Sequence, residues 1–258
     1  MSFQASSHPS DMSASDLEAA TAVAPRPDLL QHLVEISRET FGFYTSHYPH
    51  TINYPWAAAK LETLPLGSRL LDIGAGVTPV PLFLAKRGMF VECVDKNHLI
   101  RTLPTKPDWN EWGFFDYGTV HPNLSAYNRD ITEFSPRAPF DAIYGISSMA
   151  HMPRIVREAT LRRCWDWLRP GGRLLLAIDL IPASDFLWNR SEGVQVEPPI
   201  QHGTVGSVVS QLWDLQFQVS EFRVVRAVYR SRTDLSFIDC HKTAQTSIPE
   251  GNFCEARQ

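Results

Sequence analysis

The chain has 258 residues, of which 43% are hydrophobic and 20% charged, and its formal net charge is −4 at pH 7. This length fits one α/β domain with extra segments, or at most two small domains, and the composition is that of a globular protein. The acidic balance argues against nucleic acid or an anionic membrane as a partner. No apolar run approaches the roughly 20 residues of a membrane-spanning helix, and the four cysteines form no CxxC pair, so we expect a cytoplasmic protein without a metal site.

The first 66 residues are predicted to form two segments. Residues 1–27 are rich in Ser, Ala, Pro and Asp, which is typical of a disordered tail, although 16–24 could form a short helix. Residues 28–66 are expected to form a helical N-terminal extension or lid, because apolar side chains follow helical spacing over 29–44. Within this extension, two prolines indicate an ordered loop over 48–56, and a short helix is predicted at 57–64.

Strands and helices alternate from Arg69 onward. Strands are predicted at residues 69–73, 90–95, 125–129, 142–146, 174–181, 218–229 and 235–241, and helices at 79–87, 153–168 and 208–215. The RPGG sequence at 169–172 predicts a turn, and residues 245–258 are expected to be a loose C-terminal tail. The alternation predicts a mainly parallel sheet with helices on both faces.

A glycine turn follows the first strand of this pattern. The sequence LLDIGAG at 70–76 predicts a buried strand whose glycines would let a ligand approach the backbone. Asp95 ends the next strand, where a carboxylate can accept hydrogen bonds from both hydroxyls of a ribose. A nicotinamide-binding dehydrogenase would use the same geometry, but its fingerprint has a third glycine where this chain has Pro79.

Five motifs in order carry a resemblance to a known family. LLDIGAGVTP at 70–79 resembles the first motif of class I S-adenosylmethionine-dependent methyltransferases, and Asp95 matches their ribose-binding acid. NRDI at 128–131, FDAI at 140–143 and LRPGG at 168–172 resemble the family's later motifs. There are two departures: Thr78 stands where many members have a glycine, and Ala150 stands where many have the Glu of a Glu-His pair.

The resemblance implies a fold and a cofactor. The fold would be Rossmann-like, with a seven-stranded, mainly parallel sheet over a methyltransferase domain at 67–244. The cofactor would be S-adenosyl-L-methionine, with its methionine end at the glycine turn, its ribose at Asp95 and its adenine at Asp130. The alternative for Asp130 is a helix cap or turn residue. The residues expected to bind the cofactor are Asp72, Gly74, Ala75, Gly76, Asp95, Lys96, Asp130, Ile131 and Gly145.

Two histidines are candidates for the base that removes a proton from the methyl acceptor. His151 closely follows the fourth strand, at the sheet edge where the acceptor must bind, and His202 lies in a segment flanked by Gly and Pro. Either could instead have a structural role. Tyr48, Tyr54 and Trp56 are candidates for an acceptor-binding wall, or they could simply pack the extension onto the sheet.

The resulting hypothesis is methyl transfer from S-adenosyl-L-methionine to an oxygen or nitrogen of a small-molecule or glycan acceptor. One alternative is a methyltransferase-like subunit that binds without catalysing. The other is a nicotinamide-dependent oxidoreductase, which the glycine turn and Asp95 alone do not exclude. The sequence does not indicate which acceptor is methylated.

Overall fold

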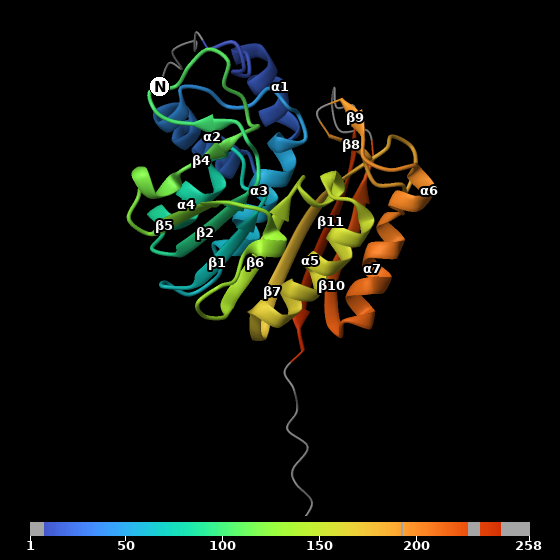
Figure 1. The fold of residues 1–258 in the computed structure, drawn as a ribbon. Coiled ribbons are helices and arrows are strands. Elements are labelled where there is room, and N and C mark those ends of the chain that lie inside the picture. Colours follow the sequence, from blue (N-terminus) through green and yellow to red (C-terminus); the bar gives the residue numbers. More distant parts are fainter. Residues whose placement is uncertain (1–7, 192, 227–232, 244–258) are drawn as a thin grey trace, which may run out of the picture.

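A seven-stranded sheet forms the centre of the molecule (Figure 1). The computed structural model describes residues 8–191, 193–226 and 233–243. The strands of the sheet are β1 (Arg69–Ile73), β2 (Phe90–Asp95), β5 (Leu124–Asn128), β6 (Phe140–Ile146), β7 (Leu168–Leu180), β10 (Phe217–Val225) and β11 (Asp234–Lys242). Their spatial order is β10-β11-β7-β6-β1-β2-β5; β11 runs antiparallel to both β10 and β7, and the other neighbouring strands pair in parallel. This confirms the predicted seven-stranded, mainly parallel sheet.

Helices cover both faces of the sheet because its central strands bury side chains on both sides. On β1, Leu70 belongs to one core cluster, whereas Leu71 and Ile73 belong to the other. The helices α2 (Pro27–Phe41), α3 (His50–Leu61) and α4 (Val80–Lys86) pack into the first cluster. The helices α5 (Arg154–Trp167) and α7 (Val205–Asp214) pack into the second, and the short α6 (Pro199–His202) leads into α7.

Part of the segment expected to be disordered is an ordered helix in the structure, and it overlaps the short helix considered at 16–24. Helix α1 (Ala14–Val23) is capped by Ser13, whose hydroxyl accepts a hydrogen bond from the backbone amide of Asp16. Met12 and Leu17 are buried, and Asp11 forms an ion pair with Arg38 of α2 at 2.8 Å. A few apolar side chains therefore anchor a polar segment, which its overall composition does not reveal. Residues 1–7 and the predicted tail at 245–258 lie outside the described residues.

Two other local predictions differ from the structure. Most of the predicted loop at 48–56 is the first half of α3, which contains Pro55 in its interior. The neighbouring Tyr54 and Trp56 are buried, so the packing of this segment overrides the helix-breaking tendency of proline. The predicted RPGG turn belongs to β7, which starts at Leu168 with a shift in its register against β6.

The segment between β2 and β5 forms a wall against the N-terminal helices. It contains the short strands β3 (Ile100–Arg101) and β4 (Phe114–Phe115) and a 3-10 turn, η1 (Tyr117–Thr119). Two hydrogen bonds tie it to the start of the chain: Ser10 Oγ donates to the Trp109 carbonyl, and His8 Nε2 donates to the Lys106 carbonyl at 2.9 Å. The other short elements are η2 (Ile131–Glu133), η3 (Met149–His151), β8 (Arg190–Ser191) and β9 (Val194–Gln195).

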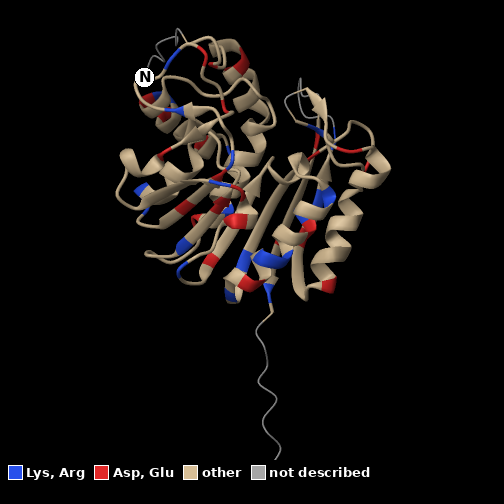
Figure 2. Ribbon diagram, viewed as in Figure 1, with Lys and Arg blue, Asp and Glu red and all other residues tan. Residues whose placement is uncertain are grey.

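Charged residues are distributed over the whole fold. Figure 2 shows Lys and Arg interspersed with Asp and Glu along the described ribbon. No helix among the described residues has the length and apolar character to cross a bilayer. Within the same residues, no three His, Cys, Asp or Glu side chains gather as a metal site.

Candidate functional site

A pocket of about 1200 Å³ opens at the carboxyl ends of the parallel strands. Ligands bind at this edge of open α/β sheets, and the volume exceeds that of a pocket for one drug-sized molecule. One side, here called the glycine side, is lined by residues 73–76, 95–99 and 129–131. The opposite side, here called the histidine side, is lined by residues 46–50, Ser147, His151, Asp179, Trp188, Arg190 and Ser191.

The glycine side begins at the turn after β1. Gly74 and Gly76 adopt φ values of 72° and 55°, which favour glycine. A Cβ on Gly74 would lie 2.5 Å from the Cβ of Ser148, and one on Gly76 would lie 2.6 Å from the carbonyl oxygen of Glu111. The turn is therefore restricted to glycine both by its conformation and by the segments that close over it.

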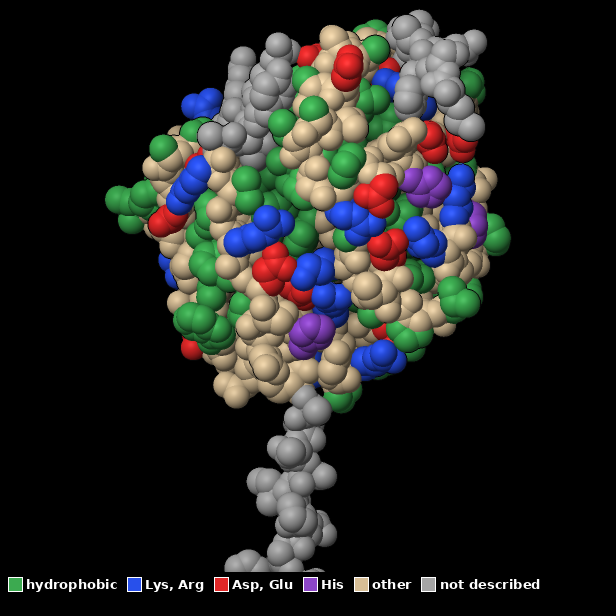
Figure 3. Space-filling model, turned by 180° about the vertical axis from the view of Figure 1, so that it is seen from behind, with side chains coloured by type: hydrophobic (Ala, Val, Ile, Leu, Met, Phe, Trp, Pro, Cys, Tyr) green, Lys and Arg blue, Asp and Glu red, His purple; other side chains and the backbone are tan. Residues whose placement is uncertain are grey.

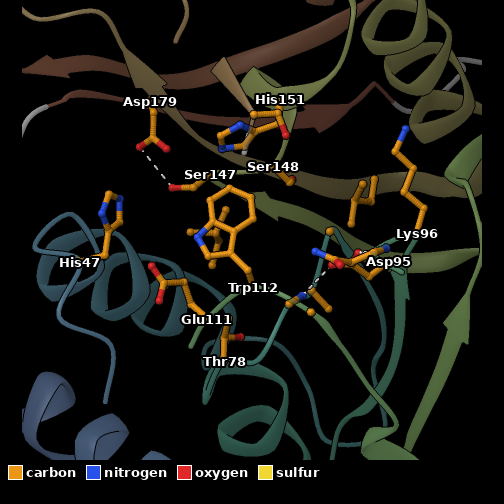
Figure 4. Close-up of a pocket in the computed structure, with 18 of the residues that line it drawn as sticks. His47, Thr78, Asp95, Lys96, Glu111, Trp112, Ser147, Ser148, His151 and Asp179 are labelled. Atoms are coloured by element: carbon orange, nitrogen blue, oxygen red, sulfur yellow. Dashed lines mark hydrogen bonds between the residues drawn. The ribbon is translucent and has the colours of Figure 1, made fainter. Parts of the chain in front are cut away.

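Asp95 lies beside this turn at the end of β2 (Figure 4). Its two carboxylate oxygens accept hydrogen bonds from the backbone amides of Gly76, at 2.9 Å, and Asn97, at 2.7 Å. Burial raises the pKa of Asp95, and the two amide hydrogen bonds oppose that effect. A carboxylate offers about four acceptor positions, so two amides leave capacity for hydroxyl donors of a ligand.

Asp130 also belongs to the glycine side, next to Ile131. Its carboxylate accepts the amide of Thr132 at 2.9 Å, which makes it the cap of η2, and Lys96 Nζ lies 3.1 Å from its other oxygen. The capping role considered from the sequence is thus present. Asp130, Ile131 and Lys96 all line the pocket as well.

Two expected cofactor residues lie outside the pocket. Asp72 is 4% exposed and faces the interior beside Tyr144 of β6, and burial raises its pKa well above the ordinary value. Gly145 is buried, and a Cβ there would lie 3.0 Å from Ser148 Oγ. Both residues shape the floor beneath the pocket, whereas Ala75 lines it together with Gly74 and Gly76.

His151 is the central residue of the histidine side. Its Nδ1 lies 2.8 Å from the carbonyl oxygen of Arg190, and a carbonyl can only accept, so Nδ1 carries the hydrogen. In the neutral ring the lone pair then resides on Nε2. Burial lowers the pKa of His151, and the nearby Asp179 carboxylate partly opposes this shift. The ring of Trp112 meets His151 edge-on at 5.0 Å between centroids.

The structure does not bring His202 or Trp56 to the pocket. His202 is fully buried, with Nδ1 3.0 Å from Glu197 and Nε2 3.0 Å from the carbonyl oxygen of Ala150. Both nitrogens are occupied, so the ring links α6 to the loop after β6 and has no lone pair for a ligand. Trp56 packs on Phe237 of β11 at 4.8 Å instead.

Tyr48 and Tyr54 do line the pocket, as expected, together with His47 and His50. Asp179, at the end of β7, is a pocket residue that sequence reasoning missed. Its signal was an acid near the end of a predicted strand, at the edge where ligands bind.

Comparison with solved structures finds similar proteins, whereas comparison of the sequence does not. No protein-family model and no curated relative matches the chain. The structure of 1,6-didemethyltoxoflavin-N1-methyltransferase from Burkholderia thailandensis superimposes with a TM-score of 0.57 and 16% identity, over 90% of this chain and 92% of that one. A putative S-adenosylmethionine-dependent methyltransferase from Listeria monocytogenes gives 0.52 and 14%, over 74% and 98%. The [4+2]-cyclase SpnF gives 0.52 and 14%, over 73% and 79%. The chain has the fold of class I S-adenosylmethionine-dependent methyltransferases.

Proposed function

We propose that the protein transfers a methyl group from S-adenosyl-L-methionine to an oxygen or nitrogen of a small-molecule or glycan acceptor. The observation that carries this proposal is one pocket with Asp95 on the glycine side and the Nε2 atom of His151 on the other. The first is suited to a ribose and the second to a proton that leaves the acceptor.

Three features of the pocket fit this cofactor. Its volume accommodates a nucleoside and an acceptor side by side. Asp95 retains capacity for ribose hydroxyls, and Ile131 offers an apolar surface for a base beside Asp130. Ser148 Oγ is buried without a hydrogen-bond partner among the described residues, directly above Gly74, where a polar group of a ligand could pair with it.

The chain's own contribution to the reaction is positioning and proton removal. When bound, the cofactor supplies a methyl group on a positively charged sulfur that leaves as a neutral thioether. His151 Nε2 takes the proton of the acceptor O–H or N–H, so that the acceptor's lone pair is free to form the new bond to carbon. His151 Nδ1 keeps its bond to the Arg190 carbonyl throughout, which holds the ring in one orientation.

The surface supports a small acceptor over a nucleic acid. Figure 3 shows acidic, basic and histidine side chains interspersed on the face that it presents, and Figure 2 shows the same mixture along the chain. A phosphate backbone would be bound by a continuous basic surface. The methyltransferase from Burkholderia thailandensis was solved with bound 1,6-didemethyltoxoflavin and S-adenosylhomocysteine, which supports the same choice.

The cofactor assignment is tested by binding of S-adenosylhomocysteine. At a hundredfold excess over its dissociation constant it should stabilise the fold by about 2.7 kcal/mol. Asp95→Ala should weaken its binding by about 1.5–3 kcal/mol, because hydrogen bonds to a charged group are lost. Calorimetry measures both effects.

Two controls make this test specific. Asp95→Asn keeps the size of the side chain and one acceptor oxygen, and Asp214→Ala changes an exposed carboxylate on α7 outside the pocket. The intact chain's failure to bind S-adenosylhomocysteine would overturn the proposal. Binding of NAD in its place would favour the oxidoreductase alternative, and cofactor binding without turnover across acceptors would favour a non-catalytic subunit.

A further inference from the structure

A directed chain of hydrogen bonds ends at Asp179 on the histidine side. His50 Nδ1 lies 3.1 Å from Asn53 Oδ1, Asn53 Nδ2 donates to Ser147 Oγ at 3.1 Å, and Ser147 Oγ donates to Asp179 Oδ1 at 3.2 Å. The chain connects α3, the loop after β6 and the end of β7. Figure 4 shows the last bond at the edge of the cavity, with His47 and His151 on either side of the carboxylate. Three elements of the fold thus hold this one group in place.

The backbone is strained at the middle of this chain. Ser147 has a φ of 56°, in the left-handed region that non-glycine residues rarely adopt, and its amide donates to the Ala177 carbonyl of β7 at 2.8 Å. Glycine would fit this conformation without strain, so a serine at this position carries a conformational cost. Compared with glycine, serine adds a hydroxyl that accepts a hydrogen bond from Asn53 Nδ2 and donates one to Asp179 Oδ1.

Asp179 differs from the other buried aspartates of the described residues. Asp239 forms an ion pair with Arg173 at 2.6 Å, and Asp234 forms one with Arg226 at 3.0 Å. Asp72 lies away from the pocket. Asp179 is 4% exposed and lines the pocket. Burial raises its pKa, and the nearby His47 and His151 and the hydrogen bond from Ser147 partly oppose this; none of the described groups that act on it is a Lys or Arg.

The surroundings of Asp179 favour a cation. A buried carboxylate without a fixed positive partner is costly, and a ligand that brings a positive charge removes that cost. Glu111 adds a second carboxylate that lines the pocket, and Trp112 and Trp188 provide aromatic faces that attract cations. Arg190 also lines this side, but its side chain is exposed, whereas Asp179 is buried. An anionic ligand at Asp179 would face like charge in a poorly hydrated site.

We propose that Asp179 binds a protonated nitrogen group of the methyl acceptor, so that the acceptor is an amine or amidine and not a phosphorylated or carboxylated metabolite. This inference rests on the proposed function, because it names the acceptor class of the same pocket. The carboxylate accepts N–H donors from the ligand on Oδ2, while Oδ1 keeps the bond from Ser147. Asn53 and Ser147 are positioning residues that hold the carboxylate for this contact.

The test uses two flat probes of the same shape and opposite charge, benzamidinium and benzoate. Calorimetric titration of the full chain, with and without S-adenosylhomocysteine, should show benzamidinium binding at least about tenfold tighter than benzoate, because charge-assisted hydrogen bonds form only with the cation. Asp179→Asn should abolish this preference. Asp214→Asn, the same change at an exposed carboxylate outside the pocket, should retain it.

A second variant keeps the test decisive if Asp179→Asn does not fold. Ser147→Gly removes the hydroxyl in a backbone conformation that glycine adopts freely, and should weaken benzamidinium binding a few-fold without lowering the melting temperature. Equal binding of the two probes, or benzamidinium binding unchanged in Asp179→Asn, would overturn the inference. Failure of S-adenosylhomocysteine to bind would overturn the proposed function alone, since the probe preference is also measured without it.

Discussion

His151→Ala is expected to lower the maximal rate of methyl transfer by at least about tenfold, and by as much as the 10²–10⁴-fold that positioned general bases contribute. The affinity for S-adenosylhomocysteine should change no more than a few-fold, because His151 lies on the histidine side and not beside Asp95. The measurement is steady-state kinetics with an acceptor found by screening amines first. Near-normal turnover would eliminate His151 as the base.

The pH dependence of the rate gives an independent check. A base acts in its neutral form, which is present above its pKa, and burial lowers the pKa of His151 below the ordinary 6.5. The rate should therefore hold at neutral pH and fall only as the pH drops below about 6.5. An acid limb above pH 7 would contradict this assignment.

Matched variants separate proton removal from packing. His151→Asn keeps a side-chain N–H that can reach the Arg190 carbonyl but has no basic nitrogen, so it should lose rate without losing stability. His32→Ala changes a half-exposed histidine on α2 outside the pocket and should leave the rate unchanged. His202→Asn should lower the melting temperature instead, because His202 is buried and bonded at both nitrogens.

Deleting residues 1–25 is expected to lower the free energy of unfolding by at least about 3 kcal/mol. Met12 and Leu17 are buried, and burying a large apolar side chain contributes about 1.5–3 kcal/mol. In a domain of this size, the melting temperature should fall by roughly 6–12 °C. Thermal unfolding followed by circular dichroism measures the change.

Point variants show whether the loss comes from packing. Met12→Ala should reproduce part of the destabilisation, since Met12 is 1% exposed. Glu18→Ala, on the exposed face of α1, should be close to neutral. A melting temperature that does not change on deletion would mean that α1 contributes nothing to the fold, as the composition of the segment had suggested.

The sequence predicted the glycine side of the pocket better than the histidine side. Strands β1 and β2 have the predicted bounds, because each is an apolar run and the glycine turn that follows β1 has a conformation few other residues can adopt. Asp95 could be found for the same reason: its position depends on the end of one strand. These are local constraints, and a single sequence displays them.

The histidine side depends on contacts between distant segments. Asp179 is joined to Asn53 through Ser147, and no spacing in the chain relates those three residues. His202 was a candidate because Gly and Pro flank it, yet tertiary packing buries it against Ala150. Local patterns cannot distinguish a histidine that faces a cavity from one that seals a helix end, because the difference arises only after the elements pack.

The two hydrogen bonds between residues 8–10 and the segment after β2 join the start of the chain to the pocket. That segment continues into Glu111, whose carbonyl oxygen accepts the Val77 amide and closes over Gly76. A ligand that stabilises the contact of Glu111 with Val77 and Gly76 should also protect the N-terminal segment against proteolysis. We therefore expect S-adenosylhomocysteine to slow cleavage before Pro27. Thermodynamic coupling is reciprocal, so a molecule that binds residues 8–10 in this closed arrangement would change ligand affinity by the same factor. Binding at residues 8–10 would then regulate ligand affinity at the pocket from a distance.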